Sequence, residues 1–190
     1  MSVGTPDPNP SGSAPEPNSA WLSDLELADI RRRVPILYVE AVPVRLDGTG
    51  QVSRVGVLLR GDAWGKITRT LVSGRVLYGE TVRHALFRHL EKDLGPMAFP
   101  QLPPSPVPFS VAEYFPIPGF SGYVDERQHA VALAYVVPVT GTCEPRQDAL
   151  EITWMTPDEA SSPEIHDEFE GGRGTLLRTA LASVGVLGNP

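Results

Sequence analysis

The chain contains 190 residues, a length that fits one domain with or without a tail. Its 20 prolines are about twice the ordinary share, and proline disrupts helices and central strands, which argues against an all-helical bundle. The net charge of −7 argues against a nucleic-acid partner, because such binding needs a basic surface. The single cysteine, Cys143, permits neither an internal disulfide nor a cysteine-based zinc site.

The distribution of proline and of apolar residues predicts how the chain is organised. Residues 1–20 hold five prolines among Ser, Gly and Asn and contain no aromatic residue, which predicts a disordered tail. We expect a single domain at 21–186, followed by a short tail at 187–190. No apolar run reaches the ~18 residues of a membrane span and no signal peptide precedes the domain, so we expect a cytoplasmic protein with no membrane partner.

The first half of the predicted domain begins with a helix and continues with extended segments. Ser23 and Glu26 have the spacing of a capping box, which predicts a short helix that ends before Pro35. Strands are predicted at 36–46 and 52–60 on either side of a turn at 47–50, with a third extended segment at 67–73.

The second half begins with the most strongly predicted helix, at 81–94, which Gly95 and Pro96 end. A proline-rich segment at 97–108 follows, and we interpret it as a stiff loop inside the domain. Further strands are predicted at 109–115, 129–139 and 152–155, and a final helix at 175–184. Because strands outnumber helices and the order is mixed, the sequence predicts an α+β fold with a mixed sheet.

The helix at 81–94 turns two ionisable side chains toward the protein interior. At 100° per residue, its apolar side chains share one broad side: Val82, Ala85, Leu86 and Leu90. His89 and Asp93 fall within the same arc, whereas Glu91 points nearly opposite. Buried charge is costly unless it is paired. Either the two groups bond to each other or to neighbouring strands, or they line a functional site.

These residues also carry a family resemblance. The spacing of Gly74, Glu80, Arg88, Leu90, Asp93 and Gly95 resembles the Nudix box of the Nudix hydrolases. The segment Asp125 to His129 and the segment Glu151 to Ala160 are similar to later parts of the same family. The resemblance covers about residues 36–160 and implies an α/β/α sandwich with a mixed β-sheet.

The resemblance also implies a site. In the family, three glutamates on this helix chiefly hold a divalent metal, and the matching positions here are His89, Lys92 and Asp93. An imidazole and an ammonium in place of two carboxylates lower the affinity for Mg²⁺, although imidazole suits Mn²⁺ or Zn²⁺. The implied residues are Glu80 and Glu151 for catalysis, Arg88, Lys92 and Arg127 for substrate binding, and His89 and Asp93 for the metal.

Two functions follow from this reading. The first is a Nudix-type hydrolase that cleaves a nucleoside diphosphate linked to another group, with Mg²⁺, Mn²⁺ or Zn²⁺ activating water. The second is a Nudix-fold module that binds a nucleotide or a protein partner without hydrolysis, with Lys92 holding phosphate directly. A homodimer formed through the sheet edge or the first helix suits either function.

Overall fold

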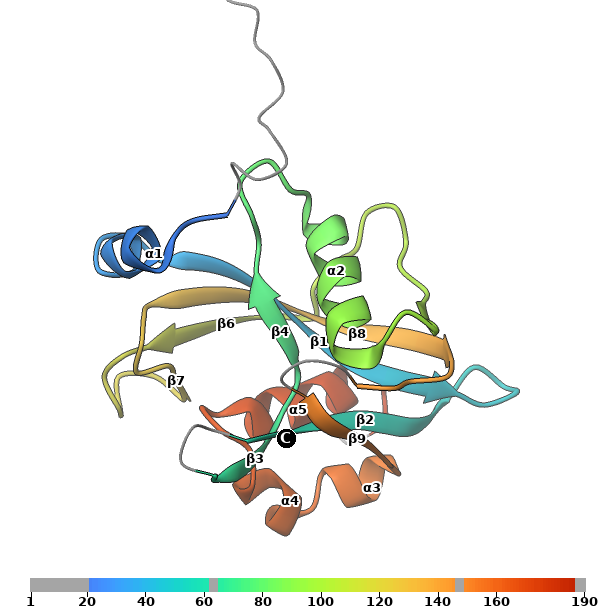
Figure 1. The fold of residues 1–190 in the computed structure, drawn as a ribbon. Coiled ribbons are helices and arrows are strands. Elements are labelled where there is room, and N and C mark those ends of the chain that lie inside the picture. The colour runs from blue at the N-terminus through green and yellow to red at the C-terminus, as the bar shows by residue number, and fades with distance from the viewer. Residues whose placement is uncertain (1–20, 62–64, 146–148, 187–190) are drawn as a thin grey trace, which may run out of the picture.

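A mixed β-sheet lies between two layers of helices in the computed structural model, which describes residues 21–61, 65–145 and 149–186 (Figure 1). One helix, α2, covers one face of the sheet, and α3, α4 and α5 cover the other face (Figure 1). The α/β/α sandwich with a mixed sheet is therefore confirmed. The predicted tails at 1–20 and 187–190 lie outside the described residues, and the single-domain extent stays a prediction.

The elements of the first half lie close to their predicted positions. They are α1 (Asp24–Arg31), β1 (Ile36–Leu46), β2 (Val52–Gly61), β3 (Ile67–Thr70), β4 (Val72–Arg75), α2 (Val82–Leu94) and β5 (Ala98–Pro100). The capping box of Ser23 and Glu26 forms at the start of α1. The segment predicted as one strand at 67–73 is two strands, because β3 pairs with β2 whereas β4 pairs with β1.

The elements of the second half include short ones that the sequence pattern did not predict. They are β6 (Ser110–Phe115), β7 (Tyr123–Val124), β8 (Ala130–Gly141), β9 (Ala149–Met155), α3 (Pro157–Ala160), α4 (Pro163–Asp167) and α5 (Arg173–Ser183). Two-residue β7 is too short for a period-2 pattern. Likewise, β5 lies inside the proline-rich loop, where it pairs with the end of β8.

Strand β1 organises the sheet, because it changes partners along its length. Along one side it pairs in parallel with β8, from Ile36 to Val44. On the other side its first half pairs with β4 up to Ala41, and its second half pairs with β2 from Val44 onward. Pro43 lies in the gap between these two pairings. Proline has no N–H to donate, and on that side neither β4 nor β2 pairs with this position. The sheet thus splits beside β1.

Two hydrophobic cores fill the space on the two faces of the sheet. The core beneath α2 contains Val39, Leu58, Leu86, Leu90 and Leu94 among its buried side chains. The core beneath α5 contains Val42, Val57, Leu176, Leu177 and Leu181. Successive residues of β1 and β2 alternate between these cores, as the pleat of a strand requires. Each ionisable side chain on these strands is therefore assigned to a face by its position.

A buried ion pair ties α5 to the sheet. Glu40 of β1 is 1% exposed and lies on the α5 face. It accepts hydrogen bonds from Nε of Arg173 at 2.8 Å, from the Tyr114 hydroxyl at 2.7 Å and from the Ser73 hydroxyl at 3.1 Å. A buried carboxylate with this many donors is satisfied, so it fixes the start of α5 against β1, β4 and β6.

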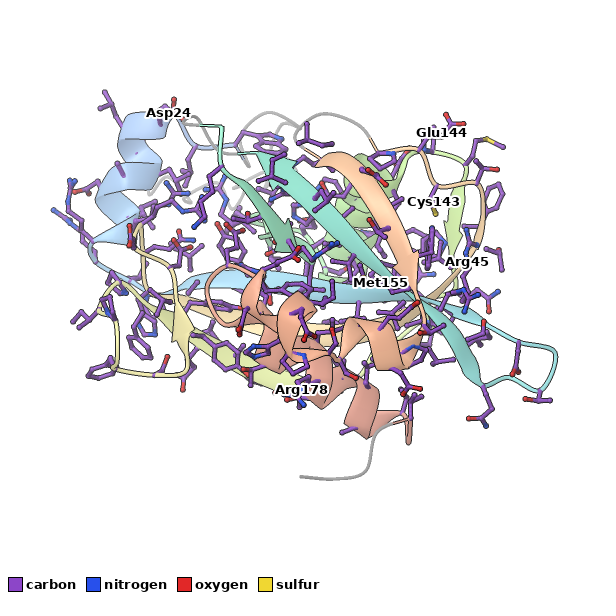
Figure 2. The ribbon with its side chains drawn as sticks, turned by 90° about the horizontal axis from the view of Figure 1, so that it is seen from below. Asp24, Arg45, Cys143, Glu144, Met155 and Arg178 are labelled. Atoms are coloured by element: carbon purple, nitrogen blue, oxygen red, sulfur yellow. The ribbon has the colours of Figure 1, made fainter. Side chains whose placement is uncertain are left out.

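Replacing Glu40 by glutamine removes the nearer counter-charge of the buried Arg173 guanidinium and leaves only Glu170, at 3.9 Å. We expect the free energy of unfolding to fall by about 3–5 kcal/mol, the usual cost of breaking a buried pair. Urea denaturation measures this change in the free energy of unfolding. As a control, Arg178 is exposed on the same helix (Figure 2), and Arg178→Ala should stay within about 0.5 kcal/mol of the parent. Equal stability of the Glu40→Gln variant and the parent would contradict a structural role for the pair.

Candidate functional site

Helix α2 carries the candidate site, and it ends at Gly95 as the sequence predicts. The hydroxyl of Thr81 caps its start by accepting a hydrogen bond from the backbone N–H of His84. Gly95 ends it with a φ of 91°, and a Cβ there would lie 2.6 Å from the Glu144 carbonyl oxygen. Figure 2 shows Glu144 beside Cys143, in the segment that follows β8. This segment packs on the end of α2 through a bond from Glu144 N–H to the Leu94 carbonyl.

Glu80 and Arg88 form the predicted brace between α2 and the loop before it. The Arg88 guanidinium donates to both oxygens of Glu80, at 2.8 and 2.7 Å, and Nη2 also donates to the Arg75 carbonyl at 2.9 Å. Burial raises the pKa of Glu80, but the bonds from Arg88 and from the Leu77 N–H lower it more, so the net pKa is lowered. The carboxylate is therefore ionised and committed to Arg88.

His89 is a neutral side chain packed against β4. It is 6% exposed, and its Nε2 lies 3.0 Å from the carbonyl oxygen of Arg75. Because a carbonyl only accepts, Nε2 carries the proton and Nδ1 does not. Burial lowers the pKa of His89 to about 4, although the bond to Arg75 opposes this shift. Nδ1 is buried and has no hydrogen-bond partner in the described part of the chain.

The depressed pKa of His89 makes acid destabilise the fold. Between the ordinary pKa of about 6.5 and the folded value of about 4, the unfolded chain binds a proton that the folded chain does not. Stability is therefore retained above about pH 6.5 and lost as the pH falls toward 4, by up to about 3 kcal/mol.

Denaturation across pH 4 to 7 measures this loss of stability in the parent and in His89→Gln. The glutamine amide can still donate a hydrogen bond to the Arg75 carbonyl. The glutamine variant should show a shallower decline with acid, because it has no group to protonate. His84, which is exposed on the same helix, is the matched control, and His84→Gln should keep the slope of the parent. Parallel curves for His89→Gln and the parent would contradict a lowered pKa at His89.

The first glycine of the box is required because the His89 ring occupies the space beside it. A Cβ built on Gly74 would lie 1.8 Å from Cε1 of His89. We expect Gly74→Ala to lower the free energy of unfolding by about 3 kcal/mol through overpacking. Adding His89→Ala should recover part of this loss, which a double-mutant cycle measures. Gly48→Ala is the control, because nothing lies within 4 Å of its new Cβ. Additive effects of Gly74→Ala and His89→Ala would contradict a clash between the two side chains.

Asp93 is fully buried at 0% exposure and lies beside two cations. Nη2 of Arg60, from β2, lies 3.4 Å from each of its oxygens, and Nζ of Lys92 lies 3.8 Å from one of them. Neighbouring strands thus supply partners to both inward-facing groups of α2, because His89 contacts β4 and Asp93 contacts β2. This outcome matches one of the two explanations left open by the sequence.

Arg60 is a site residue that the sequence reasoning missed. It lies on the same face of β2 as Leu58, whose side chain belongs to the core beneath α2. Its phase in the strand is the one signal that could have identified it, since a cation at a core-facing position requires a counter-charge. Its Nε is buried without a hydrogen-bond partner in the described part of the chain.

The structure does not bring the remaining predicted residues to this place. Glu151 of β9 pairs with Leu59, so it lies on the face opposite to Leu58 and Asp93. Arg127 donates to both oxygens of Asp125, at 2.9 and 3.0 Å, in the loop before β8. The catalytic role predicted for Glu151 and the substrate role predicted for Arg127 therefore stay predictions without support from the geometry of α2.

The described residues do not fit the divalent metal that the family resemblance implies. Within residues 21–61, 65–145 and 149–186, no group of three or more His, Cys, Asp or Glu side chains is placed to hold a metal ion. Glu80 is bound to Arg88, His89 directs an N–H to a carbonyl, and Asp93 lies between two cations. Mg²⁺ needs several oxygen ligands in octahedral geometry, which this arrangement does not offer.

Comparison with known proteins places this geometry in a family. The sequence model described as "Domain of unknown function (DUF4916)" matches residues 17–186. A solved structure described as a possible asymmetric diadenosine tetraphosphate hydrolase, from Jonesia denitrificans, is 56% identical, with 83% of this chain and 99% of that chain covered and a TM-score of 0.80. No curated protein sequence matches the chain.

More distant solved structures share the fold. A Nudix hydrolase from Nitrosomonas europaea is 12% identical, with 79% of this chain and 90% of that chain covered and a TM-score of 0.59. The Nudix domain of NrtR from Shewanella oneidensis, solved with ADP-ribose, is 15% identical, with coverage of 79% and 88% and a TM-score of 0.54. The fold is thus the Nudix fold, as the resemblance implied.

Among the helices that the structure describes, none combines the length and the apolar character that a membrane span requires.

Proposed function

The chain belongs to the family described as domain of unknown function DUF4916 and has the Nudix fold, and on this premise we propose that it hydrolyses a nucleotide whose diphosphate links a nucleoside to a second group. The 56% identical relative, described as a possible diadenosine tetraphosphate hydrolase, supports this substrate class. The observation that carries the proposal is the intact frame of the Nudix box, in which Gly74 accommodates His89 and Arg88 braces Glu80.

In this proposal the residues of α2 and β2 bind and neutralise the diphosphate. Arg60 and Lys92 supply positive charge where negative charge develops on the phosphoryl oxygens. A water oxygen bonds to one phosphorus, the bond from that phosphorus to the bridging oxygen breaks, and the proton of the water passes to solvent. Because the described donors do not fit a metal, the chemistry assigned to these residues is limited to positioning and charge stabilisation.

A second function, nucleotide binding without hydrolysis, is favoured by one specific observation. The three positions that hold metal in the family carry an imidazole that donates to a carbonyl, an ammonium, and a carboxylate beside Arg60. In the described structure each of these three groups is already engaged in another contact, so they can neutralise phosphate but none of them is placed to activate water. The same fold then serves as a receptor for the nucleotide.

Turnover assays separate the two functions. We expect hydrolysis of diadenosine tetraphosphate or ADP-ribose, tested with Mg²⁺, Mn²⁺, Zn²⁺ and EDTA and followed by chromatography of the products. Lys92→Gln should lower kcat/KM by about a hundredfold, the usual loss of one charge-stabilising donor. Arg178→Gln, on the exposed side of α5, should retain parental activity. Binding of these nucleotides with no turnover under any of these conditions would support the receptor and contradict the hydrolase.

The remaining expectations from the sequence belong with this proposal. A nucleotide-type partner follows from the substrate class. The homodimer and the cytoplasmic location stay predictions, and the mass of the protein in solution tests the first of them.

A further inference from the structure

We propose that Arg60 and Lys92 together form a phosphate-binding site that works without a divalent metal, with the buried Asp93 holding the two cations in place. This inference rests on the proposed function for the identity of the ligand, a nucleotide that carries a diphosphate. It assigns the site to Arg60, which no sequence motif marks, and it replaces the expected metal with side-chain cations.

The first support is the order of charges from the surface inward. The side chains of Arg60 and Lys92 are 25% and 30% exposed, whereas that of Asp93 is 0% exposed. A ligand that approaches from solvent therefore meets the two cations, and the carboxylate lies behind them.

The second support is the hydrogen-bonding capacity of Arg60. The distances of 3.4 Å from Nη2 to the two oxygens of Asp93 are long for such bonds, which are usually near 2.9 Å. Its buried Nε has no hydrogen-bond partner in the described residues. A guanidinium presents several N–H groups in a plane that matches two oxygens of a phosphate. Arg60 thus holds its charge beside Asp93 and keeps donors for a further acceptor.

The third support is the way in which the fold fixes the two cations relative to each other. Arg60 comes from β2 and Lys92 from α2, and the packing of Leu58 and Leu90 in one core joins these elements. The Arg88–Glu80 brace ties the middle of α2 to the loop before it. Because the cations are placed before a ligand arrives, binding loses little freedom to order them. Asp93 is a positioning residue in this account, since it acts through its cations.

Calorimetry in EDTA tests the proposal with two probes, ADP-ribose and inorganic pyrophosphate. We expect both to bind the parent protein, with an affinity that falls as salt rises. Arg60→Gln and Lys92→Gln should each weaken binding by about tenfold or more, the loss of one charge-assisted contact. Lys92→Arg, which keeps the positive charge, should bind both probes with an affinity close to that of the parent. Arg54, exposed on the same strand, is the matched control, and Arg54→Gln should bind as the parent does.

The Arg60→Gln variant leaves Asp93 with one cation fewer, so its fold needs a separate check. Arg60→Gln combined with Asp93→Asn removes both charges of that pair. This double variant should fold, which thermal denaturation checks, and it should still bind pyrophosphate more weakly than the parent does. Binding that requires Mg²⁺, or that both glutamine variants retain, would overturn the proposal and leave the hydrolase standing. Pyrophosphate binding through the two cations with no nucleotide binding would support the site but contradict the proposed function.

Discussion

The burial of the Asp93 carboxylate beneath α2 is the constraint on which the candidate site depends. A carboxylate at 0% exposure is tolerated only with cations beside it, and Arg60 and Lys92 provide them. This requirement joins β2 to the end of α2 and leaves the cations as the groups nearest to solvent. A position that holds a metal in the Nudix family thereby becomes a place suited to an anion.

The opposite face of the sheet solves the same physical problem in another way. Glu40 is also buried, but Arg173 binds it at 2.8 Å, and Tyr114 and Ser73 complete its hydrogen bonds. Such a short, fully satisfied pair contributes rigidity and offers nothing further to a ligand. The contrast with the 3.4 Å contacts of Arg60 separates a structural ion pair from one that is suited to bind an additional group.

Much of the fold could be predicted because local patterns specify it. The period of the apolar residues and the stop at Gly95 and Pro96 identified α2, and the same period turned His89 and Asp93 inward. The core-facing position of Arg60 in its strand indicated a need for a counter-charge, but its pairing with Asp93, 33 residues away, depends on how β2 packs against α2 and could not be predicted. Glu151 illustrates the same difficulty, since the face on which a strand residue lies depends on a register that sequence alone does not reveal. The shortest strand and the shortest helix, β7 and α3, have too few residues for a period.

The central claim is that this site binds phosphate through side-chain cations. A crystal structure of the protein with ADP-ribose, grown with Mn²⁺ and measured at a wavelength at which manganese scatters anomalously, tests it most directly. The account predicts diphosphate oxygens within hydrogen-bond distance of Arg60 and Lys92, with no anomalous peak beside Asp93. A manganese ion ligated by Asp93, with the diphosphate bound through that ion, would contradict it.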